Sequence, residues 1–129
     1  MSVSAMSPVT GGDFVFVPTQ DFERAAAFYG DTLGLACSAR YGRIPGGEFE
    51  TGSLTLQIIE SAAIGREFRP LGGAIALHVD DVAAARAELE GRSVTFSADT
   101  LDSGVCHMAF FEDPDGNALI LHHRYAPRT

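Results

Sequence analysis

Basic side chains are scarce in this sequence, where nine Lys and Arg stand against 17 Asp and Glu, for a formal net charge of −8. Nucleic acids and anionic membrane surfaces are bound by clustered basic residues, so this balance argues against both as partners. No apolar run approaches the roughly 20 residues that cross a bilayer. Residues 1–12 lack the basic start and apolar centre of a secretory signal, and they are predicted to form a flexible tail.

Cysteine is also rare, since Cys37 and Cys106 are the only two. They lie far apart and show no metal-binding spacing, so reduced, partly buried thiols in a cytoplasmic protein are favoured over a disulfide. The 46% apolar and 20% charged content is ordinary for a soluble globular protein. A single domain over residues 13–129 is expected to bury about two-thirds of the surface of its unfolded chain.

An internal repeat is the most informative feature that the sequence does contain. Phe14–Tyr29, FVFVPTQDFERAAAFY, aligns with Ala74–Leu89, AIALHVDDVAAARAEL, at a constant offset of 60 residues. Each copy predicts a short apolar strand, an aspartate that caps a helix, and an amphipathic helix. The two capping aspartates are Asp21 and Asp81.

Three further strands are predicted after each helix. Their expected ranges are Ala36–Gly42, Gly47–Gly52 and Leu54–Glu60, and then Ser93–Ser97, Val105–Glu112 and Ala118–His123. A Pro-Asp-Gly-Asn turn joins the last two strands, and a linker from Ser61 to Gly73 separates the halves. The predicted fold is α+β, with two βαβββ modules (about 13–61 and 73–124) forming a curved, partly open barrel-like sheet with helices outside.

Two motifs give this pattern a family resemblance. Asp21–Leu35, with Glu23-Arg24-Ala25 and a later Phe-Tyr and Leu-Gly-Leu, is similar to the first helix of the vicinal oxygen chelate superfamily. That superfamily contains glyoxalase I, extradiol dioxygenases, and fosfomycin- and bleomycin-resistance proteins. The Asp113–Asn117 turn resembles the turn in its second module, and the likeness extends from Phe14 to His123.

The superfamily's enzymes hold a divalent metal with up to four side chains, one on the first and one on the last strand of each module. The resemblance places these positions at Phe14, Gln57, Ala74 and Ile120. Phenyl, methyl and sec-butyl groups have no lone pairs to donate to a metal. Because one neutral amide cannot hold a divalent ion, the resemblance implies a protein without the family's usual metal site and with no cofactor.

Strand alternation predicts which side chains share a face, since residues two apart point the same way. With Gly52-Ser53 as a two-residue hairpin loop, Glu48 lies opposite Gln57 and Glu50 lies opposite Thr55. The predicted ligand-binding surface consists of Phe14, Phe16, Glu48, Glu50, Thr55, Gln57, His78, Met108, Phe110, Ile120 and His122. Apolar walls with a few polar anchors are typical of small-molecule sites, and Tyr41 is placed at the rim.

Several of these side chains also have a purely structural interpretation. His78 or His122 can be a hydrogen-bonded interior histidine, and Glu48 or Glu50 a solvated strand charge. The phenylalanines can fill a collapsed core. His107 and His123 fall on the opposite parity, where exposure or a subunit contact is expected. A displaced metal site built from His78, His122 and Glu48 is chemically possible.

Three functions follow from these patterns. The favoured one is a metal-independent protein that binds an aromatic or cationic small molecule, as the superfamily's bleomycin- and mitomycin-binding proteins do. The alternative is an enzyme of lyase, isomerase or dioxygenase type, using a displaced metal site or His and Glu acid–base chemistry. The third is a scaffold without a ligand. A homodimer whose copies complete each other's cavities is expected by analogy with the superfamily.

Overall fold

The computed structural model describes residues 6–128 and has two modules of the same order. The first consists of β1 (Phe14–Thr19), α1 (Phe22–Ala26) with the π-helical segment η2 (Ala27–Thr32), β2 (Ala36–Arg40), β3 (Gly46–Glu50) and β4 (Thr55–Glu60). The second consists of β5 (Ala74–His78), α2 (Val82–Glu90), β6 (Leu101–Asp102), β7 (Cys106–Glu112) and β8 (Ala118–Arg124). The α+β prediction is confirmed.

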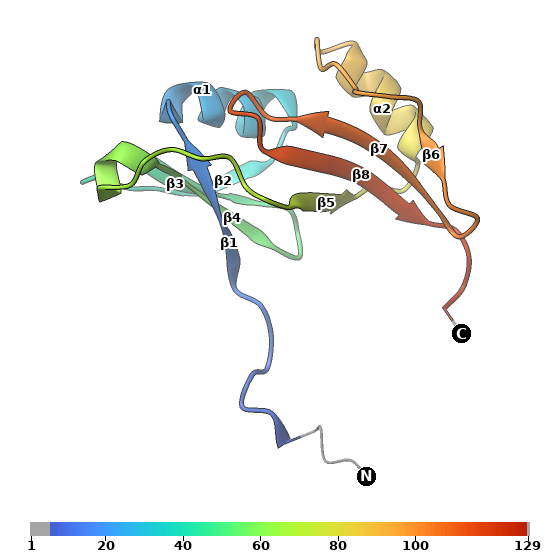
Figure 1. Cartoon of the computed structure of the whole chain (residues 1–129), viewed down its shortest axis with the longest axis horizontal. Coiled ribbons are helices and arrows are strands. Elements are labelled where there is room, and N and C mark those ends of the chain that lie inside the picture. Colours follow the sequence, from blue (N-terminus) through green and yellow to red (C-terminus); the bar gives the residue numbers. More distant parts are fainter. Residues whose placement is uncertain (1–5, 129) are drawn as a thin grey trace.

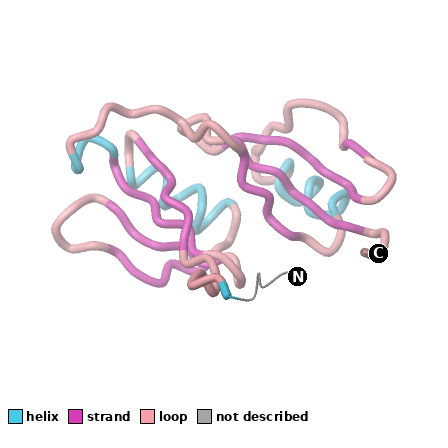
Figure 2. Tube along the Cα trace, turned by 60° about the horizontal axis from the view of Figure 1, so that its bottom comes forward, coloured by secondary structure: helices cyan, strands magenta, loops and turns pink. Residues whose placement is uncertain are grey.

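The strands form two separate four-stranded sheets, in the orders β1-β4-β3-β2 and β5-β8-β7-β6. In each sheet the first strand pairs in parallel with the last one, and the remaining pairs are antiparallel. The sheets are open rather than closed into a barrel, and they lie side by side with the helices on one side of both (Figures 1 and 2). Within residues 6–128, neither α1 nor α2 covers the opposite faces of the sheets (Figure 1).

Both helices begin where the sequence predicts. The Asp21 side chain accepts a hydrogen bond from the Arg24 backbone N–H at 3.2 Å, and Asp81 accepts one from Ala84 at 3.0 Å. These bonds satisfy backbone donors that have no partner within the helix.

The hydrophobic core lies between the helices and the sheets. Alternate residues of several strands are buried there, among them Val17, Phe49, Leu56, Ile58, Leu119 and Leu121. The helices contribute Phe22, Tyr29, Val82 and Leu89. This alternation confirms the predicted parity, in which the aliphatic residues of β5 and β8 pack under the helix.

The prediction of a strand over Ser93–Ser97 is wrong. That segment makes one isolated bridge, between Phe96 and Phe111, and the short last strand of the sheet is β6 instead. Ser93 adopts φ 71°, a left-handed conformation that interrupts an extended chain. Phe96 is buried, and the Arg86 guanidinium lies 4.8 Å from the centre of its ring, so one aromatic side chain anchors the segment.

The linker begins with a 3₁₀ turn, Ser61–Ile64. Of the expected N-terminal tail, residues 1–5 lie outside the described residues, and residues 6–12 are exposed. Cys106 is buried, whereas Cys37 is exposed rather than partly buried, and both are free thiols. None of the helices within residues 6–128 has the length and apolarity to cross a membrane.

Candidate functional site

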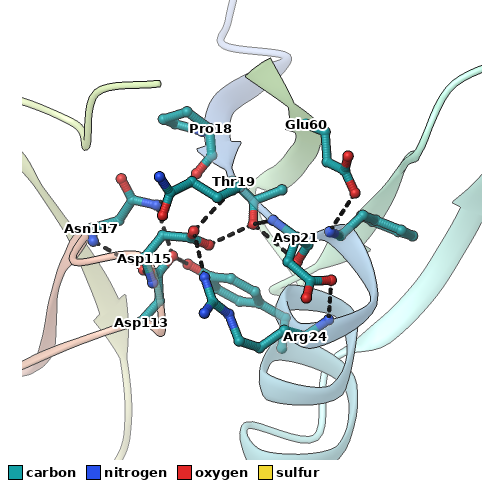
Figure 3. Close-up of polar contacts among 11 residues, drawn as sticks. Pro18, Thr19, Asp21, Arg24, Glu60, Asp113, Asp115 and Asn117 are labelled. Carbon is teal, nitrogen blue, oxygen red and sulfur yellow. Dashed lines mark hydrogen bonds and ion pairs between the residues drawn. The ribbon is translucent and has the colours of Figure 1, made fainter. Parts of the chain in front are cut away.

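A buried polar cluster surrounds the Asp113–Asn117 turn of the second module, which packs against β1 and α1 of the first (Figure 3). We call Thr19, Arg24, Tyr29, Asp113, Asp115 and Asn117 the inter-module cluster. The Asp115 carboxylate accepts hydrogen bonds from the Thr19 hydroxyl at 2.5 Å, the Gln20 N–H at 2.9 Å and the Arg24 guanidinium at 2.9 Å. A buried carboxylate with this many donors is well satisfied.

The rest of the inter-module cluster is equally complete. The Tyr29 hydroxyl donates to Asp113 at 2.7 Å, and burial together with this carboxylate raises the pKa of Tyr29 far above its ordinary value. The Asn117 amide donates to the Pro18 carbonyl at 2.9 Å, while its oxygen accepts from the Leu71 N–H at 2.8 Å. Because these groups bind one another across the contact, the inter-module cluster joins the two modules.

The open side of the first sheet carries six predicted site residues, which we call the acidic face: Phe14, Phe16, Glu48, Glu50, Thr55 and Gln57. Adjacent strands in a sheet lie about 4.8 Å apart, so paired residues are neighbours. Phe14 pairs with Thr55, which pairs with Glu50, and Phe16 pairs with Gln57, which pairs with Glu48. The predicted register is therefore confirmed, and it produces two parallel rows that each run from a phenyl ring to a carboxylate.

Hydroxyl groups hold both carboxylates in place. Glu50 accepts hydrogen bonds from Ser38 at 2.5 Å and from Thr55 at 2.6 Å, and these bonds lower the pKa of Glu50. Glu48 accepts one from the Tyr41 hydroxyl, which itself accepts from the Gln57 amide at 3.1 Å. Desolvation and the bond to Glu48 raise the pKa of Tyr41. Both carboxylates are thus oriented, Glu48 by the Tyr41 phenol and Glu50 by two aliphatic hydroxyls, with Thr55 between Glu50 and the 53% exposed Phe14.

The open side of the second sheet is largely hydrocarbon. Its predicted site residues Met108, Phe110, Ile120 and His122, which we call the apolar face, are half-buried and paired, Phe110 with Ile120 and Met108 with His122. Ala76 extends the row beside Ile120. The acidic and apolar faces thus belong to different sheets of the chain.

Among the predicted site residues, only His78 belongs to neither the acidic face nor the apolar face. Its backbone pairs with His122, yet its exposed ring contacts Asp80 at 3.2 Å and lies 5.9 Å from the ring of His123. Glu48 lies on the other sheet. The three residues of the hypothetical displaced metal site therefore do not converge within this chain. His107 pairs with His123 as expected and lies 3.4 Å from Asp102.

The side chains at the positions that correspond to the superfamily's metal ligands are poorly suited to bind a metal ion. Phe14, Ala74 and Ile120 have no donor atom, and the Gln57 amide is already bonded to Tyr41. Within residues 6–128, no group of three or more His, Cys, Asp or Glu side chains could hold a metal ion. Sequence reasoning missed Ser38 and gave Tyr41 no partner, although a hydroxyl on the strand beside two paired glutamates was a usable signal.

Comparison with known proteins places the fold in a family. Residues 11–121 match the family model of the Glyoxalase/Bleomycin resistance protein/Dioxygenase superfamily. The chain belongs to this superfamily. No curated protein matches the sequence significantly.

Several solved structures share the architecture of this chain. A member from Sphaerobacter thermophilus is 23% identical, with a TM-score of 0.74 and coverage of 88% of this chain and 97% of that one. A lactoylglutathione lyase from Agrobacterium tumefaciens is 18% identical (TM-score 0.75; 90% and 95% covered). TnmS3, an antibiotic binding protein from Streptomyces sp. CB03234, is 24% identical (TM-score 0.75; 92% and 98% covered). At these identities the likeness concerns the fold alone.

Proposed function

We propose that this superfamily member is a metal-independent binding protein for an aromatic, cationic small molecule such as an antibiotic. One observation carries the proposal: two oriented carboxylates, Glu48 and Glu50, lie in rows with Phe14 and Phe16 on an open sheet face. A planar ring can stack on the phenyl groups while its positive charge meets the carboxylates. The proposal is supported by TnmS3, an antibiotic binding protein with the same fold.

We further propose that the chain acts as a homodimer. The acidic face and the apolar face each cover one side of a ligand only, since they lie on separate open sheets. Ligand pockets usually bury most of a small molecule, so each face needs an opposing wall. The apolar face of a second copy would provide hydrocarbon opposite the acidic face, in the arrangement expected from the superfamily. The exposed free thiol of Cys37 favours a reducing compartment such as the cytoplasm.

The charge of the ligand can be tested with three acridines of nearly equal shape. At neutral pH, 9-aminoacridine is a cation, acridine is neutral and acridine-9-carboxylate is an anion. We expect affinity to fall in that order by isothermal titration calorimetry, and the cation's advantage to shrink at high salt. The double variant E48Q/E50Q should weaken the binding of 9-aminoacridine by roughly tenfold and leave the affinity for acridine unchanged. Tighter binding of the carboxylate would contradict the proposal.

The pH dependence has a defined sign. The pKa of Glu50 lies below its ordinary value of 4.5, so this carboxylate stays ionised at and somewhat below that pH. The contribution of Glu50 to the affinity for 9-aminoacridine, which is a cation throughout this range, should therefore persist above pH 4.5 and disappear only as the pH falls through the lowered pKa.

An acid–base enzyme is the second candidate, favoured by the hydrogen bond from the Tyr41 hydroxyl to Glu48. A carboxylate beside a phenol can accept a proton next to a substrate carbonyl while the hydroxyl polarises the oxygen. Exchange of a carbonyl compound's α-hydrogen for deuterium, lost in E48Q, would favour this candidate. It requires neither His78 nor a metal.

A further inference from the structure

The contact between the two modules is not symmetric, because residues related by the internal repeat differ in chemistry. On one side, the Asp113–Asn117 turn occupies a site formed by Pro18, Thr19, Arg24 and Tyr29. The 60-residue offset relates those four residues to His78, Val79, Ala84 and Leu89. A hydroxyl, a guanidinium and a phenol are thus replaced by aliphatic groups in the second half.

The hairpin that corresponds to the Asp113–Asn117 turn is also different. Four residues, Thr51–Leu54, connect β3 to β4, whereas five connect β7 to β8. The shorter connection has no carboxylate, and its Thr51 side chain is bonded within the loop, to the Leu54 carbonyl at 2.8 Å. It therefore makes no polar contacts like those of Asp113 and Asp115.

A pocket of about 360 Å³ remains at this place. Leu33, Leu35 and Leu54 line it from the first module, and Leu77, Val79 and Leu89 line it from the second. These six residues pack with the hydrophobic core on the helix side of the sheets, and Ala76, which extends the apolar face, also lines the pocket. The volume is at the lower end of the range for small-molecule sites.

Charge at the rim is already balanced. The Arg92 guanidinium binds Glu88 and the Thr32 carbonyl, the latter at 2.8 Å. The His78 ring contacts Asp80. An ion entering the pocket would have to compete with these contacts, whereas a neutral hydrocarbon gains by leaving water.

We propose that this inter-module pocket is a second ligand site, which binds a compact, neutral, largely hydrocarbon molecule. The site does not depend on the acidic face, because none of the residues that line the pocket belongs to that face. A bound molecule would occupy in one half the position that the Asp113–Asn117 turn occupies in the other.

Camphor, a compact neutral ketone, is a suitable probe. In methyl-labelled wild-type protein, NMR titration should shift the Leu33, Leu54, Val79 and Leu89 methyl signals saturably and leave those of Met108 and Ile120 in place. Ala85 lines the pocket and Ala87 is exposed on the same helix. We expect A85F to lower the affinity for camphor at least tenfold, and the matched control A87F to leave that affinity unchanged.

The outcomes separate this proposal from the proposed function. Binding of 9-aminoacridine should be equal in wild type, A85F and A87F, whichever way the camphor titration turns out. Absence of saturable shifts up to the solubility limit, or shifts confined to Met108 and Ile120, would overturn the second site. Undiminished camphor binding by folded A85F would overturn it as well.

Discussion

Replacing Asp115 by alanine should lower the free energy of unfolding by about 3 kcal/mol and the melting temperature by roughly 10 °C. The Asp115 side chain is fully buried, and its removal leaves the Gln20 N–H without its acceptor. The Thr19 hydroxyl, which is 1% exposed, loses its shorter hydrogen bond and keeps only the Asp21 carbonyl at 3.1 Å. Arg24 loses its ion pair too, although it is 46% exposed and can turn to water. Urea unfolding followed by circular dichroism measures the loss.

Two variants make this result specific. D115N keeps an oxygen acceptor in place, so it should lose about half as much stability. D99A removes an exposed aspartate and should change the free energy of unfolding by less than about 0.5 kcal/mol. Equal losses in D115A and D99A would show that the inter-module cluster does not hold the modules together.

The second large effect concerns 9-aminoacridine binding. F16A removes a ring from the acidic face and F110A removes one from the apolar face, and each should weaken binding about 10- to 100-fold. If the opposing wall comes from a second copy, an equimolar, refolded mixture of F16A and F110A will regain about a quarter of the sites at wild-type affinity. In that mixture, half of the dimers are mixed, and each of these contains one intact site.

The control for this experiment is the more conservative pair F16L and F110L, which keeps most of the buried apolar surface and should weaken binding less. Recovery in the mixture requires that the two faces of one site come from different chains. If the mixture binds no better than either variant alone, the site is formed within one chain, and the proposed dimer arrangement is wrong.

Much of the fold could be predicted because the signals are local. Asp21 and Asp81 act on the next turn of chain, and short loops fix the register of Glu48 against Gln57. Ser93–Ser97 was mispredicted because a left-handed Ser93 and one buried ring decide its path, and neither follows from β-propensity.

The site was harder to predict than the strands. A register shift between Cys37 and Ala39 on β2 decides that Ser38 reaches Glu50, and no pattern in the sequence marks that irregularity. The inter-module cluster joins residues more than 80 positions apart, such as Tyr29 and Asp113, so local sequence cannot show it. His78 has the predicted parity, but it ends an edge strand and its ring turns towards His123.

Hydrocarbon side chains occupy three of the four positions that correspond to the superfamily's metal ligands, so the proposed ligand binding should need no metal. The direct test is the affinity for 9-aminoacridine after exhaustive dialysis against EDTA, and again after separate addition of Zn²⁺, Mn²⁺, Ni²⁺ and Fe²⁺. We expect the same dissociation constant for 9-aminoacridine, within about twofold, in every sample. Loss of binding on chelation, with recovery by one equivalent of a particular metal ion, would contradict it.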